Sequence, residues 1–332
     1  MAPVHAAAPL LLVLAAGGVS ASDPPTVTLR NGVKMPMVAA GTFQYNSSQA
    51  YESIKAALAV GFTMVDTAYD YSNQDGVGRA IATVPRERVF LETKVPGCLM
   101  DPALKNPFKC YNETKTALDA DLRLLNVSYI DLVIIHFPPG QAFVVRSCGD
   151  LTGSCQMIRE QWRAMEEYYK AGKLRAIGVS NYCPSCFDCL KDAEVFPMVN
   201  QVMYHIGMGP DPAGFQSYAR SRGMVMQAYS TLGNAPWTGH AAEEITRGNL
   251  TSSIGRAHGK NSVQVALKWV VEQGVPAVTK SSNPAHLASD LDLWSWNFTP
   301  AELAALNAHK SPWGYPSFAC NSAEEAAASL IV

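Results

Sequence analysis

Four side chains of complementary chemistry stand at the ends of strand-like runs in this sequence. Asp66 follows an apolar run, and Tyr71 lies five residues further along. Lys94 and His136 each end another such run. If these runs are neighbouring parallel strands, the four side chains meet at one end of one sheet. A carboxylate, a phenol, an ammonium and an imidazole gathered there suit proton delivery to a carbonyl oxygen.

The chemistry we expect is hydride addition to a carbonyl, which builds negative charge on oxygen and benefits from a nearby proton donor. A free tyrosine, with a pKa of about 10, donates poorly at neutral pH. The Lys94 ammonium would lower the pKa of the Tyr71 phenol, and Asp66 would keep the lysine charged and in place. His136 would donate a hydrogen bond to the same oxygen and orient it.

Each of these residues has a simpler interpretation when it is taken alone. An aspartate after a strand often caps a helix, a tyrosine often fills a core, and exposed lysines are common. His136, which precedes Phe137-Pro138-Pro139, would then be an ordinary loop histidine. Because all four occur at matched strand ends, we favour one shared site.

The elements that position these residues form a repeating pattern from about residue 26 onward, in which short apolar runs alternate with helical segments. The expected strands are Met37–Ala40, Thr63–Val65, Val89–Leu91, Leu132–Ile135, Ala176–Val179, Val199–Val202, Val225–Ala228 and Ala277–Val278. The expected helices include Ser48–Val60, Glu113–Leu125, Met157–Ala171, Ala213–Ser221 and Ser262–Gln273.

Eight strand–helix units in roughly 250 residues match a (β/α)8 barrel, whose active site lies at the C-terminal ends of the strands. A doubly wound sheet is the alternative, but its first strand is usually followed by a glycine-rich phosphate loop. The first unit here reads Ala39-Ala40-Gly41-Thr42-Phe43-Gln44, without that motif. The sequence therefore predicts an α/β fold of the TIM-barrel type.

The two ends of the barrel segment carry further expectations. Two short runs within Thr26–Met35 flank Asn31-Gly32, which predicts an N-terminal β-hairpin with a type I′ turn. Since no Pro/Ser-rich linker divides the chain, residues 22–332 are expected to form one domain. The C-terminal tail is expected to be ordered near the active-site face.

The bulk composition narrows the classes of function. Of the 332 residues, 48% are hydrophobic and 16% charged, and the formal net charge is −2. No dense Lys/Arg block occurs, so nothing indicates binding to nucleic acid or to an anionic membrane. No further apolar segment of membrane-spanning length follows the N-terminal one. We expect a monomer whose mature form has no membrane anchor.

The N-terminus reads as a secretory signal peptide covering residues 1–21. Leu10–Ala16 is a short apolar core, and Val19-Ser20-Ala21 is a small-residue cleavage pattern. The alternative is a disordered Ala-rich leader, because no Lys or Arg precedes the core. Eight cysteines and several Asn-x-Ser/Thr acceptors also favour a glycoprotein that is secreted or resides in the secretory lumen. The acceptors are Asn46, Asn112, Asn126, Asn249 and Asn297.

The cysteines are expected to form disulfides that staple the substrate loops. None lies in an expected strand, and Cys148–Cys155 is the local pair we expect first. The alternative for Cys183, Cys186 and Cys189 is an iron–sulfur or zinc site, which their C-x-x-C-x-x-C spacing allows. Export and the lack of a specified fourth ligand disfavour that site, so no metal is expected.

Three segments resemble signatures of the aldo-keto reductase superfamily, and the resemblance extends along nearly the whole mature chain. Gly61–Tyr71 together with Val77–Ile81 resembles the first signature. Leu91–Lys94 resembles the lysine strand, and Asp131–Pro138 resembles the histidine strand. The catalytic tetrad that the family implies is complete as Asp66, Tyr71, Lys94 and His136.

The resemblance implies a nicotinamide dinucleotide that lies extended across the barrel mouth without a Rossmann fold. Ser180, Asn181 and Gln201 match positions that hydrogen-bond the carboxamide, a role that suits hydroxyl and amide groups. Tyr229 matches the residue that stacks on nicotinamide, with core packing as its alternative role. The remaining implied contacts near the nicotinamide and pyrophosphate are Gly41, Thr42, Asp66, Ser230, Leu232 and Gly233.

The adenosine end departs from the family pattern. Lys280 and Ser281 match residues that bind the 2′-phosphate, which favours NADP. His286 stands where the family usually has Arg, and Ser289 and Asp290 stand where it has Glu and Asn. A permanently charged fork is thus replaced by a group only partly protonated at neutral pH, which leaves NAD as an alternative.

The expected substrate pocket departs as well, because Phe43 stands where many members have Trp, and Pro96 and Phe137 complete an apolar wall of altered shape. The resemblance implies an NAD(P)H-dependent reductase of aldehydes or ketones, or the reverse alcohol oxidation, with Tyr71 as general acid. The alternative is a non-catalytic secreted barrel glycoprotein that binds a nucleotide or a partner, because reduced nicotinamide is scarce outside the cytosol.

Overall fold

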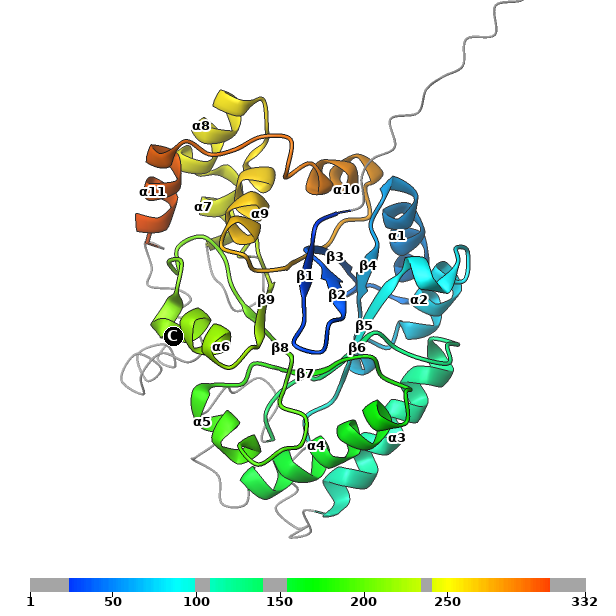
Figure 1. Ribbon diagram of the computed structural model, residues 1–332. Coiled ribbons are helices and arrows are strands. Elements are labelled where there is room, and N and C mark those ends of the chain that lie inside the picture. Colours follow the sequence, from blue (N-terminus) through cyan, green and yellow to red (C-terminus); the bar gives the residue numbers. More distant parts are fainter. Residues whose placement is uncertain (1–23, 99–107, 140–153, 234–240, 311–332) are drawn as a thin grey trace, which may run out of the picture.

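Eight parallel strands close into a barrel, with the helices on its outside (Figure 1). The computed structural model describes residues 24–98, 108–139, 154–233 and 241–310. Around the barrel the strands run in the order β10, β3, β4, β5, β6, β7, β8 and β9. The predicted (β/α)8 barrel is confirmed. The strands are β3 (Val38–Gly41), β4 (Met64–Asp66), β5 (Phe90–Val95), β6 (Leu132–Ile135), β7 (Ile177–Ser180), β8 (Val199–Met203), β9 (Val225–Tyr229) and β10 (Ala277–Thr279).

The helices begin and end at residues suited to those positions. In α1 (Ser47–Val60), Asn46 and Gln49 form a capping box, and the left-handed Gly61 ends the helix. The other α-helices are α2 (Gln74–Ile81), α3 (Phe108–Leu124), α4 (Ser154–Lys170), α5 (Pro184–Phe187), α6 (Phe215–Ser221), α7 (Ala241–Arg247), α8 (Asn249–His258), α9 (Ser262–Glu272), α10 (Pro284–Leu291) and α11 (Pro300–Ala308). The short 3-10 helices are η1 (Tyr69–Tyr71), η2 (Arg86–Arg88), η3 (Asp188–Leu190) and η4 (Pro212–Gly214).

Two apolar layers hold the barrel together, one between strands and helices and one inside the ring of strands. The inner layer is capped by the hairpin of β1 (Thr26–Thr28) and β2 (Lys34–Pro36), which contributes the fully buried Leu29 and Met35. In Figure 1 this hairpin lies across the centre of the ring. Since the hairpin covers the end where the strands begin, the opposite end of the barrel is left for polar groups.

The predicted N-terminal hairpin forms, but its turn is of a different type. Leu29 and Val33 flank a three-residue loop, in which the Gly32 N–H donates to the Leu29 carbonyl over 2.8 Å. Gly32 has a φ of 86°, whereas Asn31 has no positive φ. A type I′ turn needs positive φ at both central residues, so that prediction was wrong. The loop is instead a three-residue connection that ends in a left-handed glycine.

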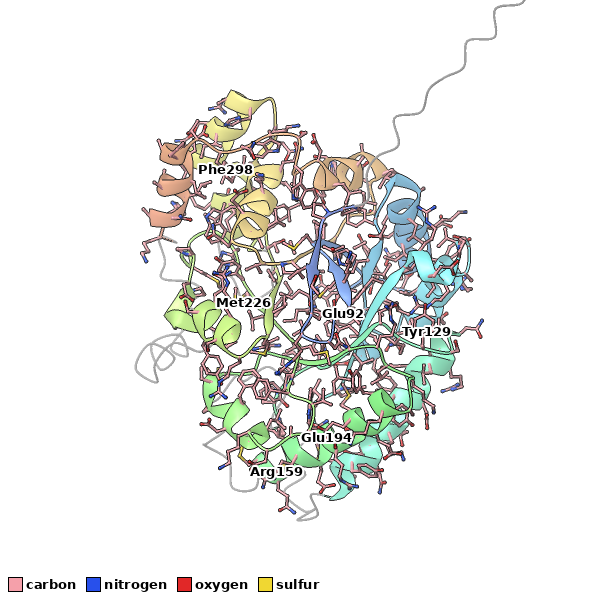
Figure 2. All side chains as sticks on the ribbon, viewed as in Figure 1. Glu92, Tyr129, Arg159, Glu194, Met226 and Phe298 are labelled. Atoms are coloured by element: carbon pink, nitrogen blue, oxygen red, sulfur yellow. A yellow bond between two sulfur atoms is a disulfide. The ribbon has the colours of Figure 1, made fainter. Side chains whose placement is uncertain are left out.

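The strands reach further toward their C-terminal ends than the sequence pattern predicted. Asp66 is the last residue of β4, and Lys94 lies inside β5, whose residues are all buried. His136 directly follows β6, as expected. Because polar residues end these strands, an apolar run alone marks their ends too early. Figure 2 shows Glu92 of β5 amid the strands, while Arg159 lies on the outer helical layer.

All six cysteines in the described ranges are disulfide-bonded. Cys98, after β5, bonds Cys110 in α3, and Cys155 in α4 bonds Cys189 in η3. The predicted Cys148–Cys155 pair was therefore wrong, because the loop after β7 brings Cys189 to the start of α4. Cys148 itself lies outside the described residues, as do the predicted signal peptide (residues 1–21) and the C-terminal tail with Cys320.

Two classes of structure are absent from the described part of the chain. No group of three or more His, Cys, Asp or Glu side chains there could hold a metal ion. With Cys189 in a disulfide, the alternative of a metal site at Cys183, Cys186 and Cys189 loses a ligand. Within the same ranges, every helix is too short or too polar to cross a membrane.

Candidate active site

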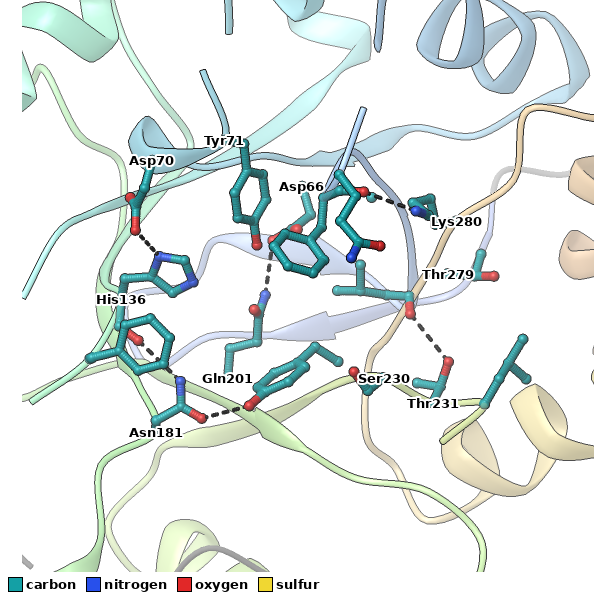
Figure 3. A pocket seen from close by; sticks show the side chains of 17 residues that line it. Asp66, Asp70, Tyr71, His136, Asn181, Gln201, Ser230, Thr231, Thr279 and Lys280 are labelled. Carbon is teal, nitrogen blue, oxygen red and sulfur yellow. Dashed lines mark hydrogen bonds and ion pairs between the residues drawn. The ribbon is translucent and has the colours of Figure 1, made fainter. Parts of the chain in front are cut away.

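A cavity of about 190 Å³ opens at the C-terminal ends of the strands (Figure 3). Residues from β3, β4, β8, β9 and β10 and from the loops that follow the strands line it. Those predicted as site residues and found in its wall are Gly41, Phe43, Asp66, Tyr71, His136, Phe137, Asn181, Gln201, Tyr229, Ser230, Leu232 and Lys280. The predicted active-site end of the barrel is thus the end that carries the cavity.

A buried ion pair lies at the base of this cavity. Lys94 Nζ donates to Asp66 Oδ2 over 2.5 Å and to the Thr67 carbonyl over 2.9 Å. The side chains of Lys94 and Asp66 are 1% and 5% exposed. Burial alone would lower the pKa of Lys94, but Asp66, Tyr71 and Glu92 together raise it above its ordinary value. The lysine is therefore a fixed cation at neutral pH.

Tyr71 stands above this cation, with its ring centre 5.2 Å from Lys94 Nζ. Burial raises the pKa of the Tyr71 phenol to about 12, while the charge of Lys94 and its hydrogen bond act to lower it. Lys94 thus acts in the direction predicted from sequence, but burial outweighs it, and the expected net lowering is wrong. The phenol therefore keeps its proton at neutral pH, and in this structure burial makes it a weaker acid than a free tyrosine.

His136 shares the cavity wall with Tyr71, and the two ring centres lie 5.7 Å apart. Its Nδ1 lies 3.0 Å from Asp70 Oδ2, and Asp70 is the residue before Tyr71. Figure 3 shows the other ring nitrogen of His136 turned toward the cavity. The four tetrad residues are therefore brought together, and Asp70 joins them.

A polar network continues below the ion pair, inside the barrel. Gln201 Nε2 lies 2.9 Å from Asp66 Oδ2 and 3.1 Å from Glu92 Oε1. Gln227 Nε2 donates to the other oxygen of Glu92 over 2.7 Å. Burial, helped by the charge of Asp66, raises the pKa of the fully buried Glu92 to about 8. The catalytic end of the barrel thus rests on a hydrogen-bonded layer.

The predicted carboxamide-binding residues form a connected group on one side of the cavity. Asn181 Nδ2 donates to the His136 carbonyl over 3.1 Å, and Asn181 Oδ1 accepts from the Tyr229 hydroxyl over 2.9 Å (Figure 3). Ser180 lies behind them, fully buried and outside the cavity lining, with its hydroxyl donating to the Gln201 carbonyl. Asn181, Gln201 and the flat ring of Tyr229 therefore face the same space.

The backbone around the cavity adopts an uncommon conformation. Gln44, Asn181 and Ser230 line the cavity with φ of 65°, 62° and 51°, although none is a glycine. Positive φ at such residues is costly and concentrates at ligand-binding sites. A Cβ on Gly41 would lie 2.9 Å from Val278 Cγ1, so only glycine permits this close approach of β3 and β10.

Two other residues implied to contact the cofactor lie outside the cavity lining. Thr42 is buried, and its hydroxyl donates to the Asp66 carbonyl over 3.1 Å. Gly233 is buried at the end of the β9 loop, where its N–H donates to the Ser230 carbonyl over 2.8 Å. In this structure both shape the backbone that carries the lining residues.

The predicted adenosine end extends from the cavity along the loop after β10. Lys280 Nζ donates to the Phe43 carbonyl over 2.9 Å and lies 4.6 Å from the Tyr45 ring centre. Ser281 Oγ accepts from the N–H of Asn283, which caps α10, and His286 is exposed in the first turn of that helix. Asp290 is buried and accepts from Thr279, and burial raises its pKa to about 6.

The apolar wall consists of two of the three predicted substrate residues. The Phe43 ring packs 5.1 Å from that of Tyr71, and the Phe137 ring stacks 4.4 Å from that of His136. Pro96 is outside the cavity lining, where its carbonyl accepts from Gln161 over 3.1 Å. The reacting centre is thus flanked by two aromatic rings.

Sequence reasoning missed two carboxylates in this region. Asp70 was read as part of the segment around Tyr71, and Glu92 as part of the strand before Lys94. The sequence nevertheless contained a signal for each of them. Asp70 directly precedes the candidate proton donor, and Glu92 is a charged residue inside an otherwise buried strand, which requires a partner. Their partners, His136 for Asp70 and Gln201 and Gln227 for Glu92, come from distant strands and are visible only in the fold.

Comparisons with known proteins agree with this geometry. The model of the Aldo/keto reductase family matches residues 37–311. The glyoxal reductase of Bacillus subtilis (strain 168) is 31% identical over 287 residues, which are 85% of this chain and 92% of the relative. A probable NAD(P)H-dependent D-xylose reductase of Arthroderma otae is also 31% identical, over 86% of this chain and 90% of the relative.

A solved structure supports the same assignment. MGS-M4, an aldo-keto reductase from a Medee basin deep-sea metagenome library, superposes with a TM-score of 0.72 at 28% identity. The match covers 86% of this chain and 94% of that one. Together with the match to the family model, the closed barrel and the gathered tetrad, this shows that the chain belongs to the aldo-keto reductase family.

Proposed function

We propose that this protein reduces aldehydes or ketones with a reduced nicotinamide dinucleotide, or runs the reverse oxidation, with Tyr71 as the general acid. One observation carries the proposal. The phenol of Tyr71 stands in a cavity wall above a buried ammonium, Lys94, which Asp66 holds at 2.5 Å. A protonated phenol over a fixed cation suits proton donation to an oxygen on which negative charge develops.

The residues present fit a nicotinamide ring. A flat aromatic wall, Tyr229, and two amide side chains, Asn181 and Gln201, face the cavity on the side of the tetrad. The two amide side chains can hydrogen-bond the N–H and C=O groups of a carboxamide, and the aromatic ring of Tyr229 can stack on the planar nicotinamide ring. When bound, the cofactor would supply the hydride.

The chain's own groups would manage the proton. Tyr71 would give its proton to the substrate oxygen, and Lys94 would stabilise the phenolate left behind. Asp66 and the Thr67 carbonyl would hold the lysine in place through both states. Phe43 and Phe137 would exclude water from the reacting centre, which strengthens these interactions.

We propose NADP as the preferred cofactor, with NAD used less efficiently. Lys280 would give a 2′-phosphate a cationic side chain, and His286 in the first turn of α10 would add a second one when it is protonated. Lys280 would exchange its present contact with the Phe43 carbonyl for the phosphate. The Arthroderma otae relative is named as NAD(P)H-dependent, which agrees with use of either cofactor.

The test is turnover of purified protein with NADPH and a panel of aldehydes and ketones, for wild type, Tyr71→Phe and Tyr69→Phe. Tyr71→Phe should lower kcat by about a hundredfold to ten-thousandfold, because the proton donor is lost. Its affinity for NADPH should be nearly unchanged. Tyr69, two residues away and outside the cavity lining, is the matched control and should keep wild-type activity.

Two outcomes would contradict the proposal. Full activity of Tyr71→Phe would exclude the phenol as the acid. A wild-type protein that binds NADPH but turns over no carbonyl would support the non-catalytic barrel instead.

We further propose that the protein matures in the secretory pathway. The disulfides Cys98–Cys110 and Cys155–Cys189 and the exposure of all five acceptor asparagines support this location. Mass measurement of protein from its native source, before and after reduction and glycosidase treatment, tests it. Eight free thiols and an unmodified mass would contradict export.

A further inference from the structure

Gln161 of α4 lies at a buried junction that none of the proposed catalytic steps uses. The residue is 1% exposed, and both ends of its side-chain amide are hydrogen-bonded. Gln161 Oε1 accepts from the Cys98 N–H over 3.1 Å. Gln161 Nε2 donates to the Pro96 carbonyl and to the Thr114 hydroxyl, each over 3.1 Å. One amide of α4 thus joins the segment after β5 to α3.

A disulfide fastens the same segment to the same helix. Cys98, which follows β5, is bonded to Cys110 in the first turn of α3, and the two residues are 5% and 1% exposed. The Thr114 hydroxyl donates to the Cys110 carbonyl over 2.8 Å, so the amide of Gln161 and the disulfide meet in α3. Helices α3 and α4 lie side by side outside the barrel (Figure 1). A double cross-link therefore stands behind the segment Pro96–Cys98.

The other side of this segment packs against the chain that follows β6. The His136 N–H donates to the Val95 carbonyl over 2.9 Å. Two residues after Val95, a Cβ on Gly97 would lie only 2.4 Å from the Phe137 carbonyl oxygen, which is closer than a Cβ can approach. Backbone therefore meets backbone at Gly97, and a shift of Gly97 would be passed on directly to Phe137.

Phe137 carries this constraint into the cavity. Its ring lines the cavity and stacks on the His136 ring, with 4.4 Å between the ring centres. Because β6 ends at Ile135, Phe137 lies outside the paired strands. Its position therefore depends on what packs against its backbone rather than on strand pairing.

We propose that Gln161 and the Cys98–Cys110 disulfide form one positioning unit, which holds Gly97 against Phe137 and thereby fixes the aromatic wall of the active site. Gln161 lies outside the cavity lining, so it acts only through this chain of contacts. Loss of the unit should weaken the binding of a substrate whose ring packs on that wall more than it slows proton transfer from Tyr71. The effect on substrate rests on the proposed function, whereas the positioning itself needs no turnover.

The first test compares benzaldehyde with propanal, an aldehyde without a ring, in steady-state kinetics with NADPH. Gln161→Met keeps a side chain of similar length but forms none of the three hydrogen bonds. It should raise the KM for benzaldehyde about three- to tenfold, the range of one aromatic contact. The value of kcat and the KM for propanal should change by less than about twofold, because the proton donor is untouched.

Two further variants should act in the same direction. Cys98→Ala/Cys110→Ala removes the disulfide and leaves Gln161 in place, so it tests the other half of the unit. Gly97→Ala leaves the unit intact, but its methyl group would push the segment away from Phe137. Both should raise the KM for benzaldehyde more than the KM for propanal. A benzaldehyde KM that stays at the wild-type value in Gln161→Met would overturn the proposal.

The control for Gln161→Met is Gln264→Met. Gln264 is another buried glutamine, which bonds Asn261 and Asp292 at the start of α9 and lies outside the cavity lining. Its loss should lower the melting temperature but leave both KM values at the wild-type level. If it raised the KM for benzaldehyde as much as Gln161→Met does, the effect would be general destabilisation and the proposal would fail.

The control for the disulfide is Cys155→Ala/Cys189→Ala. This disulfide spans 34 residues of sequence, whereas Cys98–Cys110 spans 12. Because a cross-link that closes a longer loop constrains the unfolded chain more, the control should lower the melting temperature at least as much. It should nevertheless leave the KM for benzaldehyde unchanged, and an equal rise in both double variants would contradict the proposal.

The second test needs no turnover, so it separates this proposal from the proposed function. Hydrogen exchange of the full chain measures the protection of the His136 N–H, which donates to the Val95 carbonyl. Gln161→Met should speed this exchange about tenfold by easing local opening, and Gln264→Met should not. Wild-type exchange at His136 in Gln161→Met would overturn the proposal even if carbonyl turnover is found. Faster exchange in Gln161→Met alone would support it even in a protein that turns over no carbonyl.

Discussion

The centre of the barrel and the loop after β10 both carry charges for the proposed reaction, but they hold them in opposite ways. At the centre, Asp66 and Lys94 are almost fully buried and bonded to each other at 2.5 Å. At the rim, Lys280 and His286 are exposed, and Lys280 reaches only a backbone carbonyl. The central pair is buried within the fold and helps to hold it together, whereas the two residues at the rim lie on the surface and contribute little to its stability.

The difference follows from what positions each group. Strand pairing fixes the positions of the residues at the centre. Asp66 in β4 pairs with Gly41 in β3 on one side and with Glu92 in β5 on the other. At the rim, Lys280 is positioned by the loop after β10, and His286 is positioned by the first turn of α10. Substitutions at the centre should therefore change stability and catalysis together, while those at the rim should change only the choice of cofactor.

The largest effect is expected from Lys94→Met. Removing the ammonium leaves the Asp66 carboxylate buried and unpaired, which should cost about 3–5 kcal/mol of unfolding free energy. Turnover should fall by about a thousandfold, because the phenolate of Tyr71 loses its stabilising charge. Denaturant unfolding and steady-state kinetics measure the two losses.

The control for this variant is Lys109→Met. Lys109 pairs with Glu113 on α3, and both side chains are nearly half exposed, at 48% and 46%. Its loss should change stability by about 0.5 kcal/mol or less. If Lys94→Met were as stable as Lys109→Met, the buried ion pair would not stabilise the fold, and the centre would not differ from the rim.

The centre was also the more predictable of the two regions. Asp66, Lys94 and His136 lie at or next to the C-terminal ends of strands whose apolar residues mark them in the sequence, and a closed parallel barrel brings such ends together. The exact strand ends were predicted too early, since Asp66, Lys94 and Ser180 are polar residues inside or at the end of strands. Polar residues can continue a buried strand only where the barrel interior supplies hydrogen-bond partners for their side chains.

The next effect is a pH dependence that originates from Glu92. Its pKa is raised from 4.5 to about 8, so between these values the folded chain keeps a proton that the unfolded chain releases. Stability therefore falls as pH rises through this window. Glu92→Gln has no carboxyl group to titrate at this position. Its free energy of unfolding should therefore rise relative to that of wild type by about 1 kcal/mol per pH unit between about pH 5 and 8.

Unfolding of the two proteins at several pH values checks this prediction, with the exposed Glu87→Gln as control. The control should follow the wild-type curve in parallel. A Glu92→Gln curve that also runs parallel to wild type would mean that Glu92 is ionised in the folded protein, and the network at Gln201 and Gln227 would need another account.

Contacts between distant loops were the least predictable part of the molecule. Cys155 bonds Cys189 because the segment after β7 folds back on α4, and sequence spacing alone pointed to Cys148. Asp70 meets His136 for a similar reason, since η1, which follows β4, turns the residue before Tyr71 toward the end of β6, two strands away. Periodicity fixes elements and their order, but it carries little information about which loop side chains meet.

The smallest effect is expected at the rim, from His286→Arg. A permanently charged planar fork binds a phosphate better than an imidazole does, so the ratio of kcat/KM for NADPH over NADH should rise about three- to tenfold. His309→Arg, at the end of α11, adds the same charge elsewhere and should leave the ratio unchanged. Because the site is exposed, the gain should shrink as salt increases. Equal ratios for wild type and His286→Arg at low salt would show that the 2′-phosphate does not reach α10, and the proposed preference for NADP would then lack its structural basis.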